Sequence, residues 1–273
     1  MRSRGVVTVC GFGGKGRGAG FLSGAERELL RLGLAELGGA AGVAACGDEA
    51  VLEALEWHLE KVAQENRVQN LTAITDPREM VVKHTLDSAA VLGAVTLAAG
   101  ERALDVGSGA GFPGVVLQLL VPDAQVVLLD SNRKRCAFLE RLAADLVARG
   151  VRGAGQLEVR WGRAEDEARL AGMRERFDLV VARAVAELRV LLEYTLPFSR
   201  LGGRVVAMKG PGGQEEVGQA GNALRVLGGE VERVHRIVLP EGAGERVLIV
   251  VRKVMATPGE YPRRPGVPAR RPL

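Results

Sequence analysis

The spacing of apolar residues changes near residue 100 of this chain. Beyond that point, short apolar runs typical of buried strands are separated by segments with apolar residues at helical spacing. Five such runs joined by helical crossovers predict a parallel, doubly wound α/β sheet, and the last two runs predict an added antiparallel hairpin around 241–244. The expected strands are Arg102–Val106, Gln125–Asp130, Leu157–Trp161, Phe177–Val181, Arg204–Lys209, Val231–Leu239 and Arg246–Val251.

Before residue 100 the periodicity is helical. Two helices are expected between Ser23 and about Asn66, and a third has a clear start signal. Asp76 is suited to cap that helix, Pro77 to occupy its first position, and Glu79 to complete a capping box. We therefore predict an N-terminal helical extension over 23–99, followed by one α/β domain over 100–255.

The two ends of the chain differ from the rest in composition. Residues 1–22 are rich in Gly and Arg without periodicity and are predicted to be disordered, and the Pro- and Arg-rich residues 256–273 are predicted to lack regular structure. Residues 1–23 and 261–273 each hold four basic residues and no acid, which leaves 29 basic against 33 acidic residues elsewhere. The ends are suited to contact a polyanion, although solubilising tails would have the same composition.

Composition sets further limits on function. Aromatic residues make up 4% of the 273 residues, which disfavours RNA binding by an aromatic stacking platform. The three cysteines lack metal-ligand spacing, so we expect reduced thiols, no metal and a cytoplasmic location. The longest apolar run, Ala89–Ala99, is too short to span a bilayer, so no membrane partner is expected. Nothing in the sequence demands more than a monomer.

A glycine-rich loop follows the first predicted strand, over Ala103–Gly114. Gly107, Gly109 and Gly111 let the backbone turn tightly and approach a ligand, but their spacing also suits the dinucleotide fingerprint of NAD enzymes. Asp105 discriminates between the two cofactors. A carboxylate there would repel a pyrophosphate, whereas it suits the sulfonium and ammonium groups of S-adenosylmethionine. A seven-stranded sheet with a terminal hairpin is also the arrangement of a Rossmann-like class I methyltransferase.

Other candidate residues follow the later strands, where ligands of open α/β sheets bind. Asp130 ends the second strand and can accept hydrogen bonds from ribose hydroxyls; alternatively it starts a turn in which Ser131 caps the next helix. The stretch Gly162–Glu165 either holds an adenine amine or is a plain helix N-terminus. Arg183 and Lys209 end the fourth and fifth strands, where the transferred group should lie, although a surface arginine is the alternative for Arg183.

Two motifs of known methyl acceptor sites are missing. Enzymes that methylate exocyclic amines often carry Asn/Asp-Pro-Pro-aromatic after the fourth strand, whereas this chain has Ala182–Val185 there. Methylation of cytosine C5 needs a nucleophilic cysteine, and no cysteine occurs in that loop. A ring nitrogen with a free lone pair needs neither device. Attack on the sulfonium methyl group would then depend on orientation and desolvation, with no general base.

Polar residues on two of the predicted helices have two interpretations each. The cations Arg133–Arg135 open the helix after Asp130, where they oppose the helix dipole, and either contact phosphate or form a solvated run. His84 and Asp87 lie three residues apart, hence on one helical face. They either form a structural His–Asp pair, or His84 joins Lys83 and Asn70 in closing the substrate side of the pocket.

Together these motifs resemble one family closely, that of ribosomal RNA small-subunit methyltransferase G, also called glucose-inhibited division protein B. The resemblance covers roughly residues 24–273, and the order and spacing of its short motifs make it specific. The Gly/Arg-rich start and the stretch Leu37–Gly47 depart from the family pattern. The matching motifs are Asn70–Thr72, Val82–Ser88, Asp105–Gly114, Leu129–Ser131, Gly162–Glu165, Arg183–Ala186, Lys209–Gly210 and the tail YPRRPGVP.

The resemblance implies methylation of N7 of a guanine in the decoding-region loop of 16S rRNA, with the small ribosomal subunit or its assembly intermediate as partner. It also implies a cofactor site lined by Gly107, Phe112, Ala164, Glu165 and Arg183, with Asp130 near the ribose. We assign Asp105, Gly109 and Ser131 to the same site. An NAD-dependent oxidoreductase and a non-catalytic ribosome-assembly factor are the alternatives that the sequence leaves open.

Overall fold

The computed structural model describes residues 20–41 and 44–273. Most of the predicted N-terminal tail lies outside these residues, as does Cys10. Of the tail residues that are described, Leu22 is buried and its backbone N–H donates to Glu56 Oε1 at 3.2 Å. The ordered structure therefore starts before residue 23.

Helices fill the N-terminal extension, as the periodicity predicts. The capped helix begins as expected, since Asp76 Oδ1 accepts from the Glu79 N–H at 2.9 Å. The capping box is only half formed, because the Glu79 carboxylate accepts from Lys83 Nζ instead. The run from Pro77 to Ala94 passes through a π-helical segment, η2 (Val81–Leu86). The α-helices of the whole N-terminal extension are α1 (Gly24–Ala41), α2 (Glu49–Asn66), α3 (Pro77–Met80), α4 (Asp87–Ala89) and α5 (Val91–Ala94).

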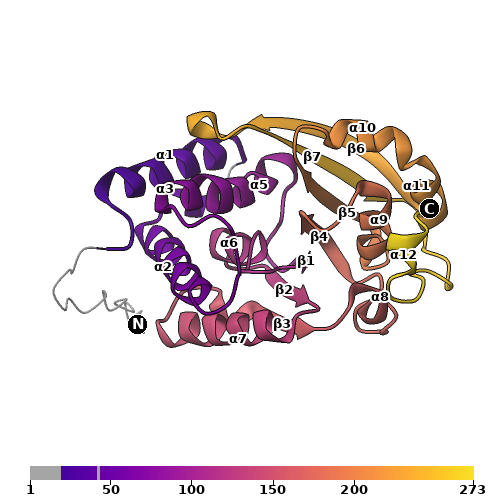
Figure 1. Ribbon diagram of the computed structural model, residues 1–273, viewed down its shortest axis with the longest axis horizontal. Coiled ribbons are helices and arrows are strands. Elements are labelled where there is room, and N and C mark those ends of the chain that lie inside the picture. Colours follow the sequence, from indigo (N-terminus) through magenta and orange to yellow (C-terminus); the bar gives the residue numbers. More distant parts are fainter. Residues whose placement is uncertain (1–19, 42–43) are drawn as a thin grey trace, which may run out of the picture.

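A seven-stranded sheet forms the centre of the molecule, in the order β3-β2-β1-β4-β5-β7-β6 (Figure 1). Its first five strands are parallel, and β7 runs antiparallel to both β5 and β6. This confirms the predicted doubly wound, mostly parallel sheet of the class I methyltransferase type with an N-terminal helical extension. The strands are β1 (Arg102–Val106), β2 (Gln125–Asp130), β3 (Leu157–Trp161), β4 (Phe177–Arg183), β5 (Ser199–Lys209), β6 (Gly229–Val238) and β7 (Glu245–Lys253).

Helices cover both faces of the sheet, and side chains that alternate along each strand pack against them. In β2, Val126 and Leu128 join the core that the N-terminal helices also enter, whereas Val127 and Leu129 join the second core. The helices after β1 are α6 (Gly114–Leu120), α7 (Arg133–Ala148), α8 (Ala164–Glu167), α9 (Leu188–Thr195), α10 (Gly213–Gln219), α11 (Gly221–Leu227) and α12 (Val267–Arg270).

The Pro- and Arg-rich C-terminal residues pack against the sheet domain, which corrects the prediction that they lack regular structure. They include the one-turn helix α12, and Tyr261 and Leu273 pack against one of the two cores. Pro268 fits at the start of α12 because the first turn of a helix needs no N–H donor there. The segment is therefore part of the fold.

Candidate functional site

The Asp105 side chain stabilises the glycine-rich loop between β1 and α6. This carboxylate is fully buried, and its Oδ2 accepts from the Gly114 N–H at 2.9 Å. Glycine at position 114 allows this close approach, since a Cβ there would lie 2.3 Å from Leu128 Cδ2 and 2.9 Å from Asp105 Cβ. Burial raises the pKa of Asp105 to about 7, although the bond from Gly114 opposes the shift. Asp105 thus contacts the loop and not the pocket, and its role at a sulfonium stays a prediction.

Asp130, at the end of β2, organises the adjoining turn. Its Oδ2 accepts from the Gly109 N–H at 2.9 Å and its Oδ1 from the Asn132 N–H at 2.8 Å. Asn132, not Ser131, caps α7, so that part of the alternative interpretation is wrong. Each carboxylate oxygen of Asp130 retains a second lone pair that can accept a hydroxyl donor.

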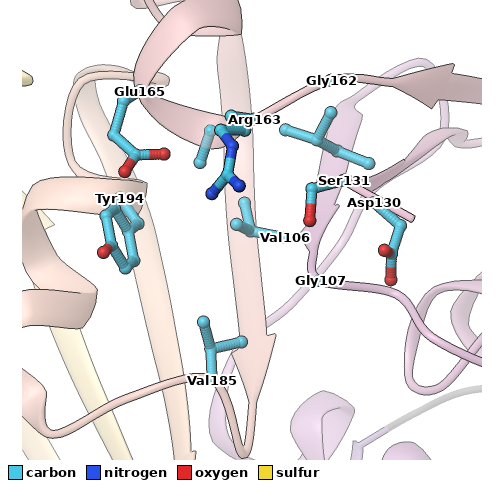
Figure 2. Close-up of a pocket in the computed structure, with 11 residues that line it drawn as sticks. Val106, Gly107, Asp130, Ser131, Gly162, Arg163, Glu165, Val185 and Tyr194 are labelled. Atoms are coloured by element: carbon cyan, nitrogen blue, oxygen red, sulfur yellow. The ribbon is translucent and has the colours of Figure 1, made fainter. Parts of the chain in front are cut away.

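A pocket opens at the carboxyl ends of β1, β2 and β3, where the topology of the sheet predicts a ligand. Figure 2 shows Asp130 and Ser131 on one side of it, with Glu165 and Tyr194 on the other. Five of the predicted cofactor residues line this pocket: Gly107, Asp130, Ser131, Ala164 and Glu165. Its other lining residues are Val106, Leu129, Gly162, Arg163, Val185 and Tyr194.

Phe112 and Arg183 lie outside this lining and form a second group of predicted residues. The Phe112 ring stacks with both His58 and His84, with ring centroids at 4.5 and 4.7 Å. The Arg183 guanidinium lies 5.4 Å from the Phe112 centroid and donates to the Lys83 carbonyl at 3.0 Å. The N-terminal extension therefore contacts the predicted cofactor residues through His58, Lys83 and His84.

Both stacked histidines are neutral at physiological pH. Burial lowers the pKa of His58 to about 4, and burial together with the charge of Arg183 lowers the pKa of His84 to about 3. His84 Nε2 lies 2.9 Å from Thr72 Oγ1, whereas Asp87 pairs with Arg183 and Arg246. The interpretation of His84 and Asp87 as a His–Asp pair is therefore wrong.

The remaining candidates are Lys209, Lys83 and Asn70. Lys209 Nζ donates to the Ala186 carbonyl and lies 2.8 Å from Glu216, so it holds the loop after β4. The Lys83 side chain pairs with Glu79 at 2.6 Å. The Asn70 residue is exposed. The structure thus brings His84 and the Lys83 backbone to Phe112 and Arg183, but it does not place Asn70 with them.

Comparison with known proteins identifies the family. The family model for rRNA small subunit methyltransferase G matches residues 51–245. The chain belongs to this family. It is 50% identical over 249 residues to ribosomal RNA small subunit methyltransferase G of Symbiobacterium thermophilum, covering 91% of this chain and 98% of that one. It is 44% identical to the protein of the same name from Pelotomaculum thermopropionicum, covering 82% and 92% of the two chains.

The family model and both relatives carry the name of an rRNA small subunit methyltransferase. Among solved structures, precorrin-6y C5,15-methyltransferase from Geobacter metallireducens aligns with 14% identity and a TM-score of 0.48, covering 68% of this chain and 91% of that one. At this level of similarity no residue role is carried over from it.

Two pocket residues of this family member, Val185 and Tyr194, are not among the site residues predicted from the sequence, whereas Arg163 lies in the predicted stretch Gly162–Glu165. Val185 lies two residues beyond the end of β4, so the rule about strand ends could have included it. Tyr194 lies within the amphipathic helix α9, where its spacing indicates only packing. Burial, followed by the charges of Glu165 and Glu193, raises the pKa of Tyr194, so its hydroxyl stays protonated.

The cations that open α7 are partly engaged by the protein. Arg133 lies 5.3 Å from the centroid of the exposed Trp161 ring, and Arg135 Nη1 lies 3.8 Å from Asp130 Oδ2. Lys134 and Arg133 remain exposed beside the pocket. Phosphate contact by this run stays a prediction.

Residues 20–41 and 44–273 contain neither a candidate metal site nor a candidate membrane span. No group of three or more His, Cys, Asp or Glu side chains is placed to hold a metal ion. No helix in these ranges combines the length and the apolar character needed to cross a membrane.

Proposed function

We propose that this chain transfers the methyl group of S-adenosylmethionine to N7 of a guanine in the decoding-region loop of 16S rRNA. The observation that carries the proposal is a pocket at the ends of β1–β3 with carboxylates on opposite sides, in a chain of this family. The proposed partner is 16S rRNA, in the small subunit or an assembly intermediate.

The residues of the pocket fit an adenosine moiety. Asp130, which is held by Gly109 and Asn132, can accept hydrogen bonds from the two ribose hydroxyls. Glu165 lies on the far side, where the adenine would reach (Figure 2), and its neighbour Ala164 also lines the pocket. An acid at the position of Asp130 serves the adenosine ribose of NAD as well as that of S-adenosylmethionine. The choice of S-adenosylmethionine is therefore supported by membership of a methyltransferase family.

Bound S-adenosylmethionine would supply an electrophilic methyl group on a sulfonium. An N7 lone pair can attack it directly, so the protein needs to orient the base and exclude water. Arg183, fixed by Asp87 and the Lys83 carbonyl, stands at the end of β4 where the acceptor would lie. No cysteine nucleophile is required, and burial and the charge of Asp130 raise the pKa of Cys136 to about 11.

Substituting Asp130 with alanine should weaken the binding of S-adenosylhomocysteine by about 10- to 100-fold, because ribose acceptors are lost and the Gly109 N–H is left unpaired. Isothermal titration calorimetry measures this affinity. Asp123→Ala, which removes an exposed carboxylate, is the matched control and should leave it unchanged. Equal affinities of the wild type and Asp130→Ala would remove the ribose assignment. Tight binding of NAD by the wild type in the same assay would overturn the choice of cofactor.

A further inference from the structure

The segment that follows β7, residues 257–273, is held against the pocket by hydrogen bonds to its backbone; we call it the C-terminal strap. Arg174 donates to the carbonyls of Thr257 and Tyr261 at 2.7 and 2.9 Å. Arg169 donates to the carbonyl of Glu260 at 3.1 Å. Both arginines follow α8, the helix that carries Glu165. The strap is thereby fixed to the chain that forms one side of the pocket.

A buried ion pair fixes the middle of the strap to α9. The Glu193 side chain is 1% exposed, and Arg263 pairs with it through Nη2 at 2.5 Å and through Nε at 2.9 Å. The Arg263 backbone N–H also donates to Glu193 Oε1 at 2.8 Å. Removing the partner of a buried carboxylate is costly, so this contact stabilises the position of the strap. Tyr194, the neighbour of Glu193, lines the pocket.

One strap residue contacts a pocket carboxylate directly. The Gly266 N–H donates to Glu165 Oε1 at 3.0 Å, and Glu165 is 5% exposed. Its second oxygen, Oε2, accepts no hydrogen bond from the part of the chain that the structure describes. Figure 2 shows this carboxylate beside Tyr194 at the pocket. The strap therefore fixes Oε1 of Glu165 and leaves Oε2 to contact a ligand.

We propose that the C-terminal strap is a specificity element of the pocket. Gly266 acts as a positioning residue: it orients Glu165 so that Oε2 accepts a hydrogen bond from the exocyclic amine of the adenine. A carboxylate is an acceptor only, so it favours a 6-aminopurine and opposes a 6-oxopurine, which presents a second acceptor. The inference rests on the proposed function, because it assumes that the pocket holds the adenosine of S-adenosylmethionine.

The backbone of Gly266 offers a direct test that removes no buried charge. Its φ of +79° lies in the left-handed region, which a β-branched residue rarely adopts and asparagine tolerates. A Cβ there would meet Arg270 Nη2 only at 3.6 Å, so strain rather than crowding decides the outcome. Gly266→Val should displace the N–H that holds Glu165, whereas Gly266→Asn should keep it in place.

The measurement is the ratio of dissociation constants for S-inosylhomocysteine and S-adenosylhomocysteine, obtained by calorimetry on the full chain. The wild type and Gly266→Asn should prefer the adenosine compound by about tenfold or more, and Gly266→Val should lower that preference to about threefold or less. Arg263→Ala, which releases the middle of the strap, should lower it too. Its matched control is Arg264→Ala, which removes the exposed neighbouring arginine and should leave the ratio as in the wild type.

The possible failures of this experiment are distinguishable. A wild type that binds neither compound would overturn the proposed function and, with it, the role of the strap. A wild type that binds S-adenosylhomocysteine but shows no preference would overturn the strap inference alone. A preference that survives in both Gly266→Val and Arg263→Ala would overturn it as well, since the strap would then not control the orientation of Glu165.

Discussion

Replacing Asp87 with alanine is expected to lower the free energy of unfolding by about 3 kcal/mol, because it leaves two partly buried arginines without their shared partner. The Asp87 side chain is 4% exposed and lies 3.2 Å from Arg183 Nη1 and 3.3 Å from Arg246 Nε. Arg183 is the last residue of β4 and Arg246 the second residue of β7, whereas Asp87 lies in α4. This carboxylate therefore joins the N-terminal extension to two strands of the sheet.

Urea denaturation followed by circular dichroism measures this loss. Asp123→Ala is the matched control, since Asp123 and Arg152 form a largely exposed ion pair on the surface, where such pairs contribute little. We expect a small change for Asp123→Ala. Equal destabilisation by the two variants would show that the Asp87 cluster contributes no more than a surface pair.

The second large effect is a pH dependence of stability that arises from Asp105. Because burial raises its pKa from 3.8 to about 7, the folded state keeps a proton that the unfolded chain has released between these values. The unfolded state thus binds fewer protons in this window, and the stability that Asp105 contributes below pH 4 is lost as the pH rises to about 7. For a shift of this size, the loss between pH 4.5 and 8 is about 3 kcal/mol.

Asp105→Asn removes this ionisable group while keeping an acceptor for the Gly114 N–H and placing a donor where Oδ1 has no partner. Relative to the wild type, the variant should therefore gain stability as the pH rises from 4.5 to 8. Denaturation of both proteins at the two pH values, without ligand, gives the difference. A stability difference between them that does not change with pH would show that Asp105 is ionised in the fold throughout.

Much of the fold could be predicted from local pattern. The bounds of β1, β2 and β3 agree with the prediction, because each is a short run closed by a turn of Gly, Pro, Ser or Asp. The strand β5 is longer than predicted, since Ser199–Gly203 reads as a polar loop although Ser199 pairs with Phe177 of β4. Pairing with β4 extends β5 over a segment whose own sequence does not indicate a strand.

The site could be predicted only as far as strand ends determine it. Asp130 and Glu165 are predictable because Asp130 ends β2 and Glu165 closely follows β3, and both strands end at the ligand-binding edge. Tyr194 and the contact between Gly266 and Glu165 are not, since the latter joins residues 101 positions apart and depends on how the strap packs. The sequence predicts that the C-terminal arginines contact a polyanion. Arg263 is less suited to this role than predicted, because its side chain is paired with Glu193.

The most direct test of the proposed function is transfer of a labelled methyl group from S-adenosylmethionine to small subunits or 16S rRNA that lack the modification. Borohydride reduction and aniline cleavage then locate any N7-methylguanine in the rRNA. The account predicts a single labelled cleavage site within the decoding-region loop, and a much weaker signal for Asp130→Ala. Absence of label in every rRNA substrate, or label at another atom of the base, would contradict it.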